Sequence, residues 1–170
     1  MVNFAPPPPS TVLTDAEIAR LIAARKPLPY GLPNPILAST NRQLRADFNI
    51  TAEDGEEFRV YIRQLEEDSL DFSAILVYRM RSAGTWIILR RYNGKSHEHR
   101  NRLDENVVFF DYHIHTATER YQRARGLRAE TYAEITSRYV DLPGAIECLI
   151  EDCGFYEPDR DPDLFDTLMD

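Results

Sequence analysis

Apolar and polar side chains alternate with a period of two along part of the chain, and this pattern limits the fold more than any other feature. The alternation covers residues 44–50 and, after a turn signal at 53–55, residues 58–63. Such alternation is typical of strands with one buried face. Further strands are predicted over 70–81 and 85–92, and the short connections between successive strands imply an antiparallel meander.

One more strand and four helices complete the predicted fold. The segment 107–115 is rich in β-branched and aromatic residues, which favour a strand. A capping box at 14–17 predicts a helix that runs to about Arg25. Later helices are predicted over 116–125, over 129–139 and from Asp141, the N-cap of the last one. Because strands precede most helices, we predict an α+β fold: an antiparallel meander sheet of about five strands, packed by an N-terminal helix and two to three C-terminal helices.

The length of 170 residues predicts one domain with tails. We expect a proline-rich extended arm over 1–13, a single α+β domain over 14–156 and an acidic tail over 157–170. No apolar run approaches the roughly 18 residues that a membrane-spanning helix needs, so no membrane partner is expected. Cys148 and Cys153 are too close in sequence to staple distant segments, which favours a reducing, cytoplasmic location.

Charge is distributed unevenly along the chain. The formal net charge is -8, and residues 157–170 hold six acidic side chains against one arginine. Between residues 79 and 128 the sign reverses, with eleven basic side chains against five acidic ones. A local basic surface steers an anionic ligand whatever the net charge, so RNA is an expected partner. The acidic tail is interpreted as a docking segment for the basic face of its own or a neighbouring chain.

All four histidines lie in two His-x-His pairs, His97 with His99 and His113 with His115. Residues i and i+2 of a strand point to the same face, so His113 and His115 are predicted to project together with Asp111. If the segment around 95–100 pairs nearby, the first two histidines join the same surface.

Three interpretations of this cluster remain open. In the first, a divalent transition metal binds to His97, His99, Asp111, His113 and His115. In the second, the histidines catalyse metal-independent acid–base chemistry on a phosphodiester. Its base is His113 or His115, its acid is His97 or His99, and its phosphate ligand is Arg90 or Arg91. In the third, the histidines are ordinary polar residues of a sheet face. Nearby cations favour a bound anion over a second cation, so no cofactor is expected, with the metal as the alternative.

Basic, amide and hydroxyl side chains around the histidines form the predicted substrate-binding set. Its members are Arg90, Arg91, Lys95, Asn101, Arg120 and Tyr121. The sequence lacks the G-x-S-x-G, G-x-G-x-x-G and H-E-x-x-H motifs, so hydrolase, dinucleotide-binding and zincin interpretations have no support.

Residues 87–101, with Leu89-Arg90, Asn93-Gly94, His97 and Asn101, are followed by His113-Ile114-His115 and by Glu119-Arg120-Tyr121. This arrangement resembles a group of small bacterial proteins of unassigned activity, whose pattern is an LR…NG…H…N segment, an H-x-H strand and an E-R-Y helix start. The resemblance covers about residues 85–153. It implies a toxin–antitoxin connection, by analogy with small metal-independent ribonucleases, and with it an antitoxin-like protein partner.

The leading interpretation is a cytoplasmic, toxin-like protein that binds RNA on a basic, histidine-bearing sheet face and cleaves it without metal. The alternative is a non-enzymatic binding or regulatory protein whose histidine cluster holds a metal ion or a protein partner. The sequence leaves open whether the chain is an enzyme.

Overall fold

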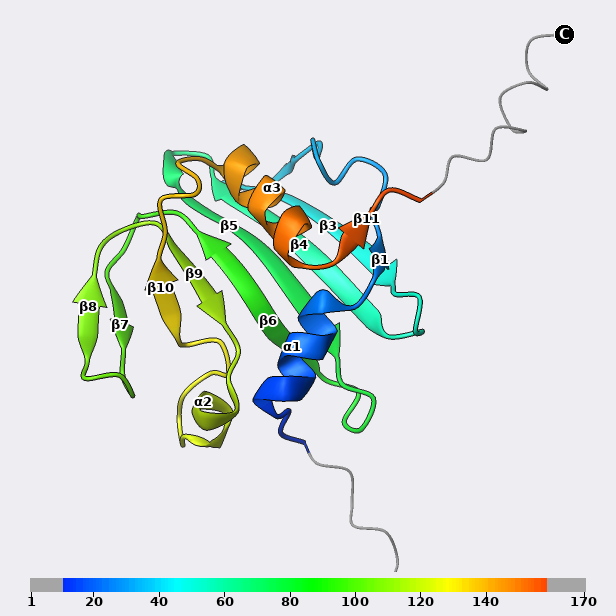
Figure 1. Ribbon diagram of the computed structural model, residues 1–170. Coiled ribbons are helices and arrows are strands. Elements are labelled where there is room, and N and C mark those ends of the chain that lie inside the picture. The colour runs from blue at the N-terminus through cyan, green and yellow to red at the C-terminus, as the bar shows by residue number, and fades with distance from the viewer. Residues whose placement is uncertain (1–10, 159–170) are drawn as a thin grey trace, which may run out of the picture.

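A seven-stranded antiparallel sheet forms the centre of the protein, in a computed structural model that describes residues 11–158 (Figure 1). The helices and strands are α1 (Asp15–Ala23), β1 (Lys26–Pro27), β2 (Ala38–Thr40), β3 (Gln43–Thr51), β4 (Glu57–Leu65), β5 (Asp68–Arg79), β6 (Trp86–Asn93), β7 (His99–Asn101), β8 (Val107–Phe109), β9 (His113–Thr116), α2 (Glu119–Arg123), β10 (Ala133–Ile135), α3 (Leu142–Asp152) and β11 (Phe155–Tyr156). The sheet order is β10-β9-β6-β5-β4-β3-β2. Beside it lie an antiparallel pair, β7 with β8, and a parallel pair, β1 with β11.

The predicted α+β class and the antiparallel meander are confirmed, although the sheet has seven strands and not about five. The four strands predicted between residues 44 and 92 are β3 to β6, and each pairs with the next along the chain. The predicted arm at 1–13 and the predicted tail at 157–170 lie mostly outside the described residues. The docking role predicted for the tail concerns these same residues.

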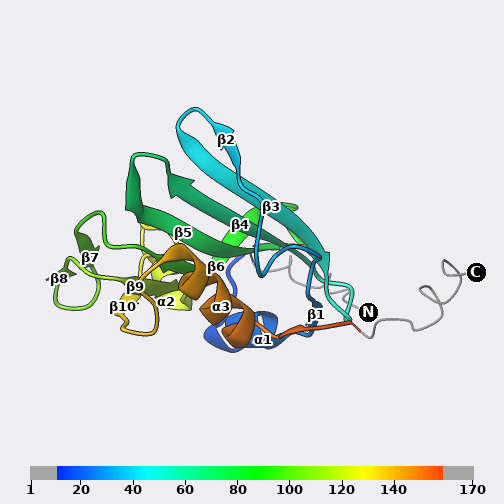
Figure 2. The same ribbon diagram turned by 90° about the horizontal axis from the view of Figure 1, so that it is seen from above.

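Two helices, α1 and α3, pack on one face of the sheet (Figures 1 and 2). Both begin where the sequence predicts. The Thr14 hydroxyl accepts a hydrogen bond from the Glu17 backbone N–H (3.1 Å), and the Glu17 carboxylate accepts one from the Thr14 N–H (2.7 Å). The Asp141 carboxylate accepts from the Gly144 N–H (2.9 Å) and caps α3. No described helix is long and apolar enough to cross a membrane.

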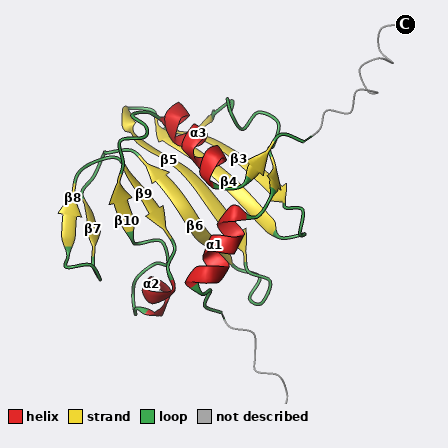
Figure 3. Cartoon of the chain, in the orientation of Figure 1, coloured by secondary structure: helices red, strands yellow, loops and turns green. Residues whose placement is uncertain are grey.

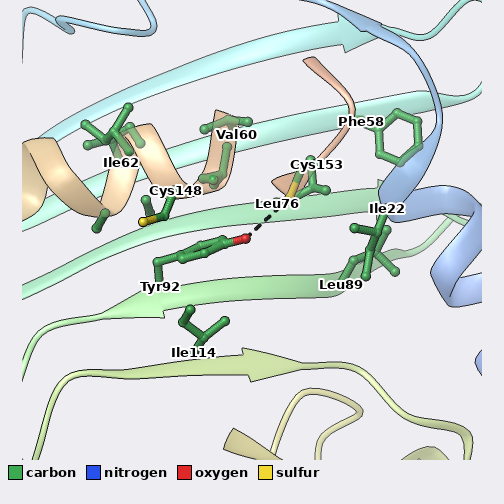
Figure 4. Close-up of a cluster of buried hydrophobic side chains, with 14 of the residues drawn as sticks. Ile22, Phe58, Val60, Ile62, Leu76, Leu89, Tyr92, Ile114, Cys148 and Cys153 are labelled. Carbon is green, nitrogen blue, oxygen red and sulfur yellow. Dashed lines mark hydrogen bonds between the residues drawn. The ribbon is translucent and has the colours of Figure 1, made fainter. Parts of the chain in front are cut away.

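Between these helices and the sheet lies the hydrophobic core (Figure 4). Val60, Leu76 and Leu89 of the central strands are fully buried and face the helices. Tyr92 is also buried, and its hydroxyl donates to Asp152 of α3 (2.8 Å). Cys148 is a core residue, as its free thiol and burial show. The sheet is therefore apolar on this face.

The other face of the sheet is not covered by α1 or α3, and we call it the open face (Figure 2). Its side chains occupy the alternate positions of the paired strands. They are Arg45, Asp47 and Asn49 of β3; Glu57, Arg59, Tyr61 and Arg63 of β4; Asp71, Ser73, Ile75, Val77 and Arg79 of β5; Trp86, Ile88, Arg91 and Asn93 of β6; and His113 and His115 of β9.

A buried lysine joins the two helices at their C-terminal ends. The ammonium group of Lys26, which is 0% exposed, donates to the carbonyl oxygens of Leu21, Ile22 and Ala24 at the end of α1, at 2.8–2.9 Å. It also donates to the carbonyl of Cys153, the C-cap of α3, at 2.9 Å. Carbonyls at helix C-termini lack intrahelical partners, and the three N–H groups of this cation are shared among four such acceptors.

The single strand predicted over 107–115 is wrong, because the segment divides into β8 and β9. β8 leaves the main sheet and pairs with β7, while β9 inserts between β6 and β10. Phe110 lies in the break and is 62% exposed, although the alternation places it in the core. Asp111 lies in the same break, so it does not continue the row of His113 and His115.

Two helix predictions also fail after residue 116 (Figure 3). The first predicted helix is shorter than expected: α2 begins at Glu119, with Thr118 as its N-cap, and ends at Arg123. The helix predicted over 129–139 does not form, and the segment contains strand β10 instead. β10 pairs with β9 through Ala133 and His115, so hydrogen bonding to a distant strand decides this conformation.

Candidate functional site

Two histidines of β9 lie at the β10 side of the open face. His113 pairs with Asn93 of β6, and His115 pairs with Arg91 of β6 and with Ala133 of β10. Their shared face is confirmed as predicted. Both are buried, with exposed fractions of 0% and 6%.

The β7–β8 pair places a third histidine against them. His99 of β7 is half-buried, and its ring centroid lies 5.1 Å from that of His113 and 4.8 Å from that of His115. Phe109 of β8 packs on the other side, 5.1 Å from His99 and 5.4 Å from His113. The departure of β8 from the main sheet is thus what brings the two His-x-His pairs together.

Backbone carbonyls determine which ring nitrogen carries the proton in each of the two β9 histidines. The Nδ1 atom of His113 lies 2.6 Å from the carbonyl oxygen of Asp111, and that of His115 lies 2.7 Å from the carbonyl oxygen of Glu130. A carbonyl only accepts, so each Nδ1 carries the proton and each Nε2 carries a lone pair. Both Nε2 atoms face the Asn93 amide nitrogen, at 3.4 and 3.3 Å.

An asparagine holds the third histidine in place. The His99 Nε2 atom lies 2.9 Å from the Asn101 Oδ1 atom. Asn101 is itself clamped to β10, because its amide donates to the Ala133 carbonyl (2.7 Å) and its Oδ1 accepts from the Ala133 N–H (2.9 Å). The structure therefore places Asn101, predicted to bind substrate, as the residue that orients His99.

Together, His99, His113 and His115 form a potential metal-ligand set, in which one nitrogen from each ring lies within 4.8 Å of the others. Three nitrogens around a tetrahedral ion with Zn–N bonds of about 2.05 Å are about 3.3 Å apart, so small side-chain rotations would complete the site. The Nδ1–H bonds to carbonyls are the usual outer-sphere contacts of metal-binding histidines.

Burial keeps these imidazoles neutral. Desolvation, followed by the effects of the neighbouring His113, His99 and Arg91, lowers the pKa of His115 to about 2. Desolvation is also the largest cause that lowers the pKa of His113 to about 4 and the pKa of His99. Of the four histidines only His97 is exposed. Its ring lies edge-on to that of His113, with the centroids 5.7 Å apart.

Asp111, the carboxylate of the predicted metal set, does not join the three histidines. Its Oδ1 atom accepts from the Tyr112 N–H (2.8 Å), and its backbone carbonyl contacts His113. The contribution of Asp111 to the site is thus a main-chain acceptor.

The two predicted phosphate ligands lie on opposite faces of β6. Arg91 is on the open face, and its guanidinium lies 3.4 Å from the Glu130 carboxylate. Arg90 is on the helix face, above the ring of Tyr92 and 3.9 Å from Asp152 of α3. Successive residues of a strand point in opposite directions, so of the two only Arg91 lies beside the histidines.

The remaining predicted substrate-binding residues form contacts of their own. Arg120 and Tyr121 of α2 both bind the Asp104 carboxylate, at 2.6 and 2.8 Å. Tyr121 is fully buried, so it supports the 102–106 turn. Lys95 lies 5.0 Å above the ring of Tyr112. None of the three has a described hydrogen bond or ion pair with a histidine.

Two site residues escape prediction from the sequence. Glu130 supplies a carbonyl to His115 and a carboxylate to Arg91, but it falls in a segment that predicts a helix. Ser73 donates its hydroxyl to the Asn93 Oδ1 atom (2.8 Å) and is fully buried. A small polar residue within the apolar run of β5 was the only available signal.

Comparison with protein families, with curated proteins and with solved structures finds no match for this chain. The resemblance drawn from residues 85–153 therefore stays a prediction, and the site is interpreted from its own geometry.

Proposed function

We propose that the protein binds one transition-metal ion, with Zn²⁺ as the first candidate, through His99, His113 and His115. The observation that supports this proposal is the orientation of the two β9 imidazoles. Each is locked by an Nδ1–H bond to a carbonyl, and each directs an Nε2 lone pair toward the same small space. Neutral imidazole is a preferred ligand of Zn²⁺, Cu²⁺ and Ni²⁺.

A purely structural role accounts less well for this orientation. Two acceptor nitrogens that converge need a donor between them, and the Asn93 amide is at 3.3–3.4 Å from both. These distances are longer than the range of about 2.7–3.2 Å that is usual for N–H···O hydrogen bonds. A cation bound between the lone pairs would satisfy both nitrogens at shorter range.

The Asn93–Ser73 pair allows the site to accept an ion. A half-turn of the Asn93 amide would present its oxygen to the metal and its nitrogen to the Ser73 hydroxyl. A hydroxyl can donate or accept, so the hydrogen bond between the two side chains survives this change. Three histidines also leave a coordination position for this oxygen, for water or for an external ligand.

The arginines near the site oppose a cation less than the sequence suggests. Arg90 is directed away from the histidines and toward Asp152. Arg91 is on the same face, but the Glu130 carboxylate neutralises its charge. The proposal needs no catalytic activity; ion binding is sufficient, and metal-independent RNA cleavage stays a separate prediction.

Calorimetric titration tests the proposal. Chelator-treated full-length protein is titrated with Zn²⁺, and we expect one ion per chain with a dissociation constant of about 1 μM or tighter. His115→Gln and His99→Gln should each weaken binding at least about 100-fold. The matched control is His97→Gln, which removes a neighbouring exposed imidazole and should change the affinity by less than about threefold.

Two results would overturn the proposal. One is the absence of heat and of retained zinc at millimolar ion concentrations in a folded wild-type protein. The other is an equal loss of affinity in the His97 and His115 variants, which would point to a loose surface site. Circular dichroism of each variant establishes that the fold is retained, and the half-buried His99 provides a test if His115→Gln fails to fold.

A further inference from the structure

Arginine and aromatic side chains gather on the open face, away from the histidines. Arg59 and Tyr61 of β4 are neighbours on this face, and the Arg59 guanidinium donates to the Tyr61 hydroxyl at 3.4 Å. The same guanidinium lies 4.4 Å above the ring of Trp86. We call these three residues the Arg59 platform. Arg63, two residues further along β4, extends the row.

The charge of Arg59 is not compensated. Arg63, Arg79 and Arg91 of the open face lie at 3.2, 2.7 and 3.4 Å from the carboxylates of Asp71, Glu57 and Glu130. Arg59 has no carboxylate partner among residues 11–158, and its buried Nε atom has no hydrogen-bond partner. It is thus a cation that is held between aromatic groups and is still available to an anion.

Two hollows adjoin the platform. One, of about 290 Å³, is lined by Arg45, Asp47, Tyr61, Arg63 and Ile75 among others. The second, of about 220 Å³, is lined by Asn49, Arg59, Arg79 and Trp86 among others. Each hollow therefore combines an aromatic wall, an apolar floor or edge, and polar side chains that can contact a base or a phosphate.

We infer that the open face binds single-stranded nucleic acid, with the Arg59 platform as its centre. Proteins bind single strands by stacking bases on aromatic rings and on guanidinium planes while basic groups follow the backbone. Arg59, Tyr61 and Trp86 supply the stacking surfaces, and Arg45 and Arg63 flank them. Exposed bases and a flexible backbone fit shallow hollows, whereas a duplex needs a continuous basic groove, which the acidic side chains of this face interrupt.

The bound strand would extend toward the histidines. Tyr61 pairs with Ile75, Ile75 with Arg91, and Arg91 with His115 across β4, β5, β6 and β9. This row leads from the platform to the candidate metal site. The inference does not rest on the metal, because none of the platform residues contacts a histidine.

The chain provides its own probe of this surface. Trp86 is the only tryptophan of the sequence and is 38% exposed on the open face. Stacking of a base on it should quench its fluorescence. The test uses full-length protein with chelator present, so metal binding cannot contribute, and a mixed-sequence RNA 12-mer, the same DNA 12-mer and the RNA duplex as probes.

We expect the single-stranded RNA to quench Trp86 and to bind at 50 mM salt, with an affinity that falls as salt rises. Arg59→Ala and Tyr61→Ala should each weaken binding about tenfold, and Arg59→Ala should lower the salt slope by about 1. Tyr61→Phe should restore most of the affinity because it keeps the ring. The control is Arg123→Ala, an exposed arginine of α2, which should bind as the wild type does.

Equal binding of RNA and DNA single strands supports the inference, and a preference for RNA narrows it to that nucleic acid. Tighter binding of the duplex than of the single strand overturns it. So does the absence of quenching up to about 100 μM of the RNA 12-mer, or a loss in Arg123→Ala as large as that in Arg59→Ala. His115→Gln should leave the quenching of Trp86 unchanged. Failure of metal binding and failure of nucleic-acid binding can therefore be distinguished.

Discussion

Replacement of Lys26 by methionine should destabilise the fold strongly. The ammonium group is the shared donor to four carbonyl oxygens at the ends of α1 and α3, at 2.8–2.9 Å. A buried acceptor that loses its donor costs about 1–3 kcal/mol. Four such acceptors give about 4–12 kcal/mol. Removal of a desolvated charge offsets part of this cost, because burial already lowers the pKa of Lys26 to about 8.

We therefore expect Lys26→Met to lower the free energy of unfolding by about 3 kcal/mol, measured by urea denaturation at pH 7. The melting temperature should fall by about 6–12 °C for a domain of this size. Lys95, the only other lysine, provides the matched control: it lies over the ring of Tyr112, and Lys95→Met should cost less than about 1 kcal/mol. A Lys26→Met protein as stable as the wild type would refute this account of how the helices are joined.

Two further predictions concern stability. Between pH 7 and pH 5 the metal-free protein should lose about 4 kcal/mol of unfolding free energy in urea titrations. The reason is that the pKa values of His113 and His115 are lowered to about 4 and about 2 in the folded state, while the unfolded chain takes up protons near pH 6.5. A pH-independent midpoint would contradict this prediction. Gly94→Ala should cost about 2 kcal/mol or more, because a Cβ there would overlap the Leu70 carbonyl, and a melting temperature within 2 °C of the wild type would argue against that contact.

Local sequence patterns predicted the elements whose conformation is decided locally. The capping box at Thr14 and the N-cap at Asp141 fix α1 and α3, and the period-two alternation fixes β3 and β4. β10 could not be predicted in this way. Residues 129–139 have no clear strand pattern, and Ala133–Ile135 becomes a strand because β9 offers it an unpaired edge.

The candidate site was predictable only in part for the same reason. The period of a strand predicts that His113 and His115 share a face, and it also shows that Arg90 and Arg91 cannot. His99 lies beside these two histidines because β8 leaves the main sheet and pairs with β7. This pairing cannot be predicted from the local sequence. Asn93 and Ser73 become a pair only because β5 and β6 are in register.

The central claim is that His113 and His115 bind a metal ion through their Nε2 atoms. Long-range ¹H–¹⁵N spectra of the imidazole rings, recorded before and after one equivalent of Zn²⁺, test it most directly. We predict that both rings carry the proton on Nδ1 throughout. Zinc should shift the Nε2 resonances of His113 and His115 and leave those of the exposed His97 unchanged. Unchanged Nε2 resonances, or protons on Nε2 in the metal-free protein, would contradict it.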